Sequence, residues 1–173
     1  MEIWGKGKRF GFVKISDRKV YWYALINENK FKENLDLTEI FRDFDSLVFE
    51  ILESTQKENI ILNDIFDLTP IPKWYAENLC LIGDAAHATT PNMGQGACQS
   101  IEDAYVIGKL LEKTKDFNSV FEEFQKIRRK KLDYIVKNSW TIGKISQWEK
   151  GNRLRNFLMR SVPESMNQKM VEK

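Results

Sequence analysis

Residues 81–96 read LIGDAAHATTPNMGQG, and this stretch determines how the other parts of the 173-residue chain are interpreted. Its first residues form a short apolar run that predicts a strand, which ends at Gly83-Asp84. An ionised aspartate only accepts hydrogen bonds, so its natural partner is a hydroxyl group or a metal ion. Gly94 and Gly96 let the backbone approach a ligand closely, because glycine has no Cβ atom. The stretch is therefore typical of a ligand-binding loop at the end of a strand.

A helix is predicted after this loop, because Ala97, Ile101, Ala104, Gly108 and Leu111 recur at helical spacing. The first N–H groups of a helix have no partner within it, and the helix dipole is positive at that end. Such an end stabilises negative charge on a ligand. An aspartate for hydroxyl groups, a loop of close approach and this helix end together suit a polyhydroxyl cofactor that becomes anionic.

The order of residues in this region resembles a motif of a known family. The matching positions are Gly83-Asp84-Ala85-Ala86-His87, Pro91, Gly94-Gln95-Gly96 and Glu102-Asp103-Ala104. They are similar to the second flavin motif of the class A FAD-dependent monooxygenases, and most similar to its salicylate hydroxylase and zeaxanthin epoxidase branch. Weaker similarity extends over nearly the whole chain, as the C-terminal half of such an enzyme.

The resemblance implies that FAD is the cofactor. Asp84 would accept a hydrogen bond from the ribityl chain, and Pro91 would lie beside the isoalloxazine ring. The backbone of residues 94–96 would face the N1 and C2 carbonyl edge of that ring. The implied cofactor-binding residues are Gly83, Asp84, Pro91, Gly94, Gln95, Gly96 and Ala97.

The same resemblance implies a reaction class. In such enzymes NAD(P)H reduces FAD, and one oxygen atom of O2 passes to a small organic substrate, which is aromatic, polycyclic or isoprenoid. The cofactor carries this chemistry, so the motif assigns no catalytic residue and no metal site. His87, the only histidine, is expected to have a structural hydrogen-bonding role. The alternative interpretation is a catalytically silent folded fragment that oligomerises or needs a partner chain, and binds no flavin alone.

The sequence as a whole predicts an α+β fold in two parts. Residues 1–72 would form a partial substrate-domain β-sheet with helices. Residues 73–173 would form the C-terminal strand-loop-helix part of an FAD-binding domain, followed by a long C-terminal helix. The expected elements are a hairpin (10–15 and 20–26) whose second strand lies inside the sheet, one or two helices (34–54), a strand (59–68), a buried strand (79–82), a long helix (117–150) that Gly143 could interrupt, and a short helix (154–160).

Two features of the family are missing from this sequence. The strand–glycine turn–helix unit that receives the FAD pyrophosphate is not found, and no Asp-Gly dipeptide occurs. The glycines of residues 5–11 do not replace that unit, because they open a hairpin instead of a helix. We therefore expect the chain to start inside the substrate domain and to bind FAD weakly or not at all alone. Apolar surface around residues 79–82 and the helix after Gly96 would favour a homo-oligomer or a second chain.

Composition excludes several other classes of protein. Apolar residues make up 42% and charged residues 30%, which is ordinary for a folded soluble protein. A net charge of +2 argues against nucleic acid as a main partner, and no apolar run is long enough for a transmembrane segment. Cys80 and Cys98 are expected in the core and fit a reducing cytoplasm. The basic run at 128–131 is expected to be a solvated helix face.

Overall fold

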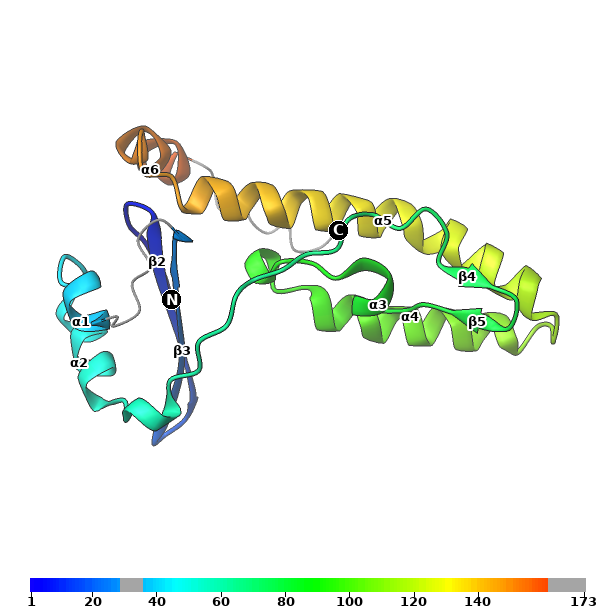
Figure 1. Cartoon of the computed structure of the whole chain (residues 1–173), viewed down its shortest axis with the longest axis horizontal. Coiled ribbons are helices and arrows are strands. Elements are labelled where there is room, and N and C mark those ends of the chain that lie inside the picture. Colours follow the sequence, from blue (N-terminus) through cyan, green and yellow to red (C-terminus); the bar gives the residue numbers. More distant parts are fainter. Residues whose placement is uncertain (29–35, 162–173) are drawn as a thin grey trace. The chain divides into compact units, whose positions relative to one another are not determined.

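The computed structural model describes residues 1–28 and 36–161, and its elements are shown in Figure 1. Helices and small sheets are mixed along the chain, as the sequence predicts. Two compact units can be distinguished: residues 1–62 together with the chain from residue 144 onward, and residues 63–143. The division into functional parts at residue 72 stays a prediction.

The first unit contains a three-stranded antiparallel sheet with strand order β1-β2-β3. Its strands are β1 (Glu2–Trp4), β2 (Lys8–Ser16) and β3 (Lys19–Ile26). The predicted hairpin is confirmed, with Asp17 and Arg18 as its turn. The prediction that the second hairpin strand lies inside the sheet is wrong, because β2 is central and β3 is an edge strand. β3 carries apolar residues on both faces, which is why burial of both faces was predicted. Trp22 packs toward the core, whereas Tyr21 on the opposite face is 56% exposed.

Two short helices cover one face of this sheet, as predicted for residues within 34–54. α1 (Leu37–Ile40) and α2 (Ser46–Ser54) each begin at an aspartate, Asp36 and Asp45, whose carboxylate accepts backbone N–H groups. The apolar sides of the helices and the sheet meet at Phe10, which is fully buried. The core around it consists of Phe10, Phe41, Val48, Ile51 and Leu52, with Trp22 stacked on Phe10 at 5.4 Å between ring centroids.

A buried arginine ties the C-terminal part of the first unit to its sheet. Arg155 lies on α6 (Asn152–Arg160), which follows Gly151 in the left-handed conformation (φ 81°). The guanidinium group is 1% exposed and donates hydrogen bonds to the carbonyl oxygens of Ser146 (2.6 Å) and Gly5 (3.1 Å). Burial lowers the pKa of Arg155 from its ordinary value. The side chain thus satisfies backbone oxygens at a helix end and a strand turn simultaneously.

The second unit contains a much smaller sheet than predicted. β4 (Tyr75–Ala76) pairs antiparallel with β5 (Leu79–Cys80), and residues 60–73 form neither helix nor strand, so the strand predicted at 59–68 is wrong. The strand predicted at 79–82 is confirmed for Leu79–Cys80, but its predicted burial is wrong, since Leu79 is 59% and Ile82 38% exposed. The reason is local. Among the described residues, β5 has a single pairing partner, reached by a tight turn in which Glu77 has a positive φ (50°).

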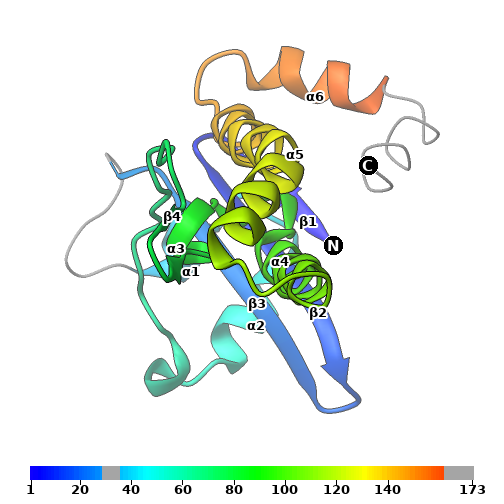
Figure 2. The same cartoon turned by 90° about the vertical axis from the view of Figure 1, so that its right-hand side faces the viewer.

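Two long helices form the frame of the second unit. α4 (Gly96–Leu111) and α5 (Phe117–Ser146) run antiparallel and side by side (Figures 1 and 2). The short α3 (Asp84–His87) and the 3-10 turn η3 (Pro91–Met93) precede α4. α5 is continuous through Gly143, so the interruption considered there does not occur. The core of this unit is formed by Trp74, Ala86, Phe124 and Leu132.

One face of α4 exposes apolar side chains, as the sequence predicts for this region. Ile101 is 70% and Tyr105 65% exposed. Cys98 is exposed on the same helix, so its predicted place in the core is wrong. The apolar side chains of Ile127 and Tyr134 recur at helical spacing, which predicts that they face the core, but both are exposed on α5. Within the described residues, no helix has the length and apolar character needed to cross a membrane.

We predict that Arg155→Ala lowers the free energy of unfolding by about 2–3 kcal/mol, because it removes charge-assisted hydrogen bonds to buried carbonyl groups. Urea unfolding followed by circular dichroism measures the change. The exposed Arg153 on the same helix provides the control, and Arg153→Ala should change the free energy by less than about 0.5 kcal/mol. Equal effects of the two substitutions would contradict the structural role of Arg155.

Candidate functional site

The predicted ligand-binding loop begins at a strained glycine followed by an exposed carboxylate. Gly83 is buried and has φ 57° and ψ −139°, a conformation that favours glycine. A Cβ atom at this position would lie 2.7 Å from the Ser100 hydroxyl oxygen. Asp84 follows as the first residue of α3 and is exposed. In the described part of the chain, its carboxylate has neither a hydrogen-bond donor nor a cation as partner.

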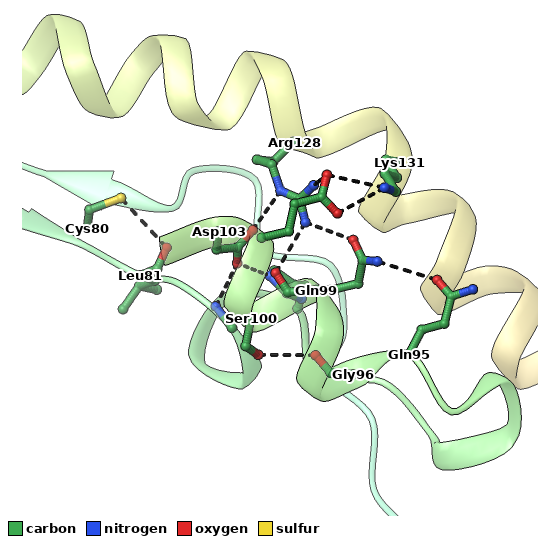
Figure 3. Close-up of polar contacts among 12 residues, drawn as sticks. Cys80, Leu81, Gln95, Gly96, Gln99, Ser100, Asp103, Arg128 and Lys131 are labelled. Carbon is green, nitrogen blue, oxygen red and sulfur yellow. Dashed lines mark hydrogen bonds and ion pairs between the residues drawn. The ribbon is translucent and has the colours of Figure 1, made fainter. Parts of the chain in front are cut away.

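A second aspartate, Asp103 on α4, holds this turn from inside the protein (Figure 3). Its side chain is fully buried, and its Oδ2 atom accepts the Gly83 N–H at 2.9 Å. The same oxygen accepts a hydrogen bond from Nε2 of His87 at 2.6 Å. His87 is 7% exposed, so it has the structural role that the sequence predicts. One carboxylate therefore connects the strand end, α3 and α4.

Arg128 of α5 supplies the positive charge beside Asp103. Its Nε donates to Oδ1 of Asp103 at 2.7 Å, and its second terminal nitrogen donates to the side-chain oxygen of Gln99 at 2.8 Å. Glu102 bridges Arg128 and Lys131 at the edge of this cluster. The prediction of a solvated basic face at residues 128–131 is therefore wrong for Arg128, which is 2% exposed. A buried carboxylate without such a partner would be strongly unfavourable.

The cluster also determines two pKa values. Burial would raise the pKa of Asp103, but hydrogen bonds from His87, Gly83 and Arg128 outweigh burial and hold this pKa below its ordinary value. At Cys80, burial and then the negative charge of Asp103 raise the thiol pKa to about 11. Asp103 is therefore ionised at neutral pH, whereas Cys80 is a neutral thiol that carries no nucleophilic chemistry.

The middle of the loop is attached to α5. Asn92 donates hydrogen bonds to the hydroxyl oxygen of Thr90 at 2.7 Å and to the carbonyl oxygen of Ser139 at 2.9 Å. The buried Ser139 hydroxyl in turn donates to the carbonyl oxygen of Thr90 at 2.5 Å. Gly143 makes room for this contact, because a Cβ atom there would lie 2.4 Å from Nδ2 of Asn92. The close approach of the Asn92 side chain to α5, rather than a break in the helix, explains why residue 143 is a glycine.

The end of the loop presents an open backbone. Gly94 is in the left-handed conformation (φ 64°), and a Cβ atom built on it would meet no atom within 4 Å. α4 then begins at Gly96 without a hydrogen bond from a capping side chain. Ala97 in its first turn is exposed. The first N–H groups of α4 are therefore available to an anionic or carbonyl group of a ligand.

The structure thus groups the predicted residues by exposure. The exposed members are Asp84, Pro91, Gly94 and Ala97; Gln95 and Gly96 are half-buried, and Gly83 is buried. A cavity of about 370 Å³ in the second unit is lined by Trp74, His87 and Lys137 among others. None of the seven predicted residues lines it, although Ala86 and His87 of the same loop do.

Sequence reasoning missed the residues that hold the loop in place. Asp103 stood within the quoted motif but received no role, and Arg128 was assigned to solvent. A signal was present: an aspartate on the apolar side of a predicted helix needs a buried partner, and a basic residue on the next helix can provide it. Ser139 gave no signal, because serine occurs on either face of a helix.

Comparison with known proteins gives consistent results. The family model described as "FAD binding domain" matches residues 44–130. Aurachin C monooxygenase/isomerase of Stigmatella aurantiaca is 35% identical over 153 residues, which are 86% of this chain and 40% of that protein. The 2-heptyl-3-hydroxy-4(1H)-quinolone synthase of Pseudomonas aeruginosa is 32% identical, over 99% of this chain and 47% of that protein.

A solved structure shows the same fold. HpxO of Klebsiella pneumoniae, determined with FAD and uric acid, superimposes with a TM-score of 0.85 at 21% sequence identity. The match covers 99% of this chain and 46% of HpxO. The chain therefore spans about half the length of the relatives that it matches.

We predict a pH dependence of stability that depends on Asp103. Because its pKa is lower in the folded than in the unfolded chain, its ionised form stabilises the fold above about pH 4, and this contribution is lost as pH falls further. Asp103→Asn should lower the free energy of unfolding at pH 7 by about 3 kcal/mol. The substitution should also reduce the loss of unfolding free energy between about pH 5 and 2, as measured by urea unfolding. The exposed Asp133→Asn is the control, and equal pH profiles of wild type and Asp103→Asn would contradict the network.

The independent observations coincide at one loop. The matched range contains every residue from Gly83 to Ala97 as well as Asp103 and Arg128, which hold that loop. The similar proteins include the aurachin C monooxygenase/isomerase and the FAD-dependent urate hydroxylase of Klebsiella oxytoca, which is 28% identical over 76% of this chain and 36% of that protein. The fold of the chain is that of about half of HpxO. The chain therefore belongs to the FAD-binding domain family of the class A flavin-dependent monooxygenases.

Proposed function

We propose that this chain supplies the ribityl-side part of the FAD site in a monooxygenase that transfers one oxygen atom from O2 to an organic substrate. The observation that supports this most strongly is the exposed Asp84 carboxylate, which has no partner among the described residues, in the same loop as the open backbone at Gly94. Both features lie in the loop that matches the family motif. FAD, reduced by NAD(P)H, would supply the redox chemistry.

The polar groups of the loop fit FAD in two respects. Asp84 is an acceptor without a partner, as a ribityl hydroxyl donor requires. Gly94 leaves space for a flat ring to approach the backbone, and the uncapped start of α4 offers N–H donors. Pro91 is exposed beside these groups, where its ring can pack against the isoalloxazine. The role of this chain is thus to bind and orient the cofactor.

No side chain of the loop is proposed as a catalytic acid or base. His87 is buried, and its Nε2 is already hydrogen-bonded to Asp103. Asp84 is exposed and faces solvent, which suits hydrogen bonding rather than proton transfer to a buried substrate. The positive end of α4 would instead favour negative charge on the reduced ring by electrostatics.

The substrate class is proposed from the named relatives. They include enzymes named for aurachin C, for a heptyl-hydroxyquinolone, for zeaxanthin and for urate, all of which are aromatic, polycyclic or isoprenoid compounds. We propose a substrate of this range, oxidised by hydroxylation or epoxidation in the cytoplasm.

A second candidate function follows from the exposed apolar face of α4. Ile101 and Tyr105 on this helix are more than a third exposed. So are Leu79 and Ile82, which precede the loop in the sequence. Exposed apolar side chains that gather on one helix face can mark an interaction site. The chain could thus act as a folded module that binds no flavin alone and associates with a further chain or a second copy.

We predict weak but saturable binding of FAD to the isolated chain, measured by quenching of flavin fluorescence. Asp84→Ala should weaken this binding about tenfold, because it removes a charge-assisted hydrogen bond. Asp64→Ala is the matched control, since Asp64 is an exposed carboxylate of the same unit that lies outside the loop.

Two outcomes would contradict the proposal. Equal loss of affinity in both variants would show a charge effect instead of a specific contact. The absence of any saturable binding by the wild-type chain would favour the second candidate function.

A further inference from the structure

We propose that Asp103 is a positioning residue for the flavin: it sets the backbone of Gly83 and thereby the direction of the Asp84 carboxylate. This inference rests on the proposed function, because Asp84 is its end point. It assigns a role to a buried carboxylate that touches no ligand-accessible surface.

The geometry of the turn shows why such a residue is needed. α3 has four residues, which is too short for a helix to be stable by itself. Its N-cap residue is Gly83, which offers no capping side chain. The carbonyl oxygen of Gly83 accepts the N–H groups of Ala86 and His87, so the orientation of α3 follows the backbone of Gly83. The structure fixes this backbone from the other side, through the Gly83 N–H, which Asp103 accepts at 2.9 Å.

The direction of the Asp84 carboxylate depends on the backbone of Gly83. Its own side chain has no partner among the described residues, so no contact beyond the backbone aims it. A hydrogen bond to a ribityl hydroxyl requires donor and acceptor to lie within about 3 Å. A small rotation of the Gly83 peptide would therefore remove the contact without unfolding the unit.

The partner of Asp103 extends the same control to the other end of the loop. Arg128 donates to the carbonyl oxygen of Gln99 at 3.2 Å as well as to its side chain, and the Gln99 amide contacts the side chain of Gln95 (Figure 3). The ion pair of Asp103 and Arg128 thus contacts Gly83 directly and is connected through Gln99 to Gln95, at the start of α4.

The test compares Asp103→Asn with Glu102→Gln. Each substitution removes one carboxylate from α4 that pairs with Arg128, but Glu102 accepts no hydrogen bond from the loop and is partly exposed. Asp103→Asn should shift the amide resonances of Gly83 and Asp84 in the ligand-free protein and weaken FAD binding about tenfold. Glu102→Gln should change the affinity by less than about twofold.

A double-mutant cycle separates positioning from general stability. If Asp103 acts through Asp84, Asp103→Asn should weaken FAD binding by less than about twofold in an Asp84→Ala background. Fully additive losses would overturn the inference. Should Asp103→Asn not fold, Gly83→Ala displaces the same peptide while the pair of Asp103 and Arg128 is kept, and it should give the same non-additivity with Asp84→Ala.

The two proposals fail in different ways. A wild-type chain that binds no FAD contradicts the proposed function, and the ligand-free amide resonances then decide on Asp103 alone. Unchanged resonances of Gly83 and Asp84 in Asp103→Asn would overturn the positioning role. Normal FAD binding by wild type and Asp103→Asn alike would overturn it while leaving the proposed function intact.

Discussion

A carboxylate removed from water needs both a positive partner and hydrogen-bond donors, and in this protein Asp103 obtains them from separate elements. Arg128 provides the charge from α5, and Gly83 and His87 provide donors from the segment before α4. The requirement works in both directions, because the guanidinium of Arg128 is equally buried and equally dependent on Asp103. As a result, α4, α5 and the loop between β5 and α4 are held in one arrangement, although the apolar core beneath them is small.

The loop is fixed on its buried side and open on its exposed side, as its proposed role in flavin binding requires. Its buried side is fixed by the Gly83 peptide and by Asn92, which is bonded to Ser139. Its exposed side carries the Asp84 carboxylate, which has no partner among the described residues, and the left-handed Gly94, where a Cβ atom would meet no atom within 4 Å. Preorganisation of this kind lowers the entropy lost on binding, because the acceptor and the N–H donors are already in place. The same division explains why the loop can belong to a binding site and still lack any catalytic acid or base.

The sequence predicted the local elements well and the tertiary environment poorly. The hairpin, the two short helices, α4 and α5 follow from periodicity, which depends on neighbouring residues alone. The strand predicted at 59–68 does not form, because a strand requires a pairing partner. The strand at 79–82 forms only at Leu79–Cys80 and is not buried, because β4 is its single partner in the described chain. The exposed positions of the candidate site were recognised through a family motif, whereas Arg128 and Ser139 were not. Their roles depend on which helix faces which, and a single sequence does not contain that information directly.

If the loop from Gly83 to Ala97 is a preformed part of a flavin site, FAD should shift its backbone amide resonances. A titration of the isotope-labelled chain with FAD tests this directly. We predict saturable shifts at Gly83, Asp84 and residues 94–97, with little change at the hairpin turn of Asp17 and Arg18. Shifts confined to the cavity around Trp74 and Lys137, or no shifts at all, would contradict the proposed site.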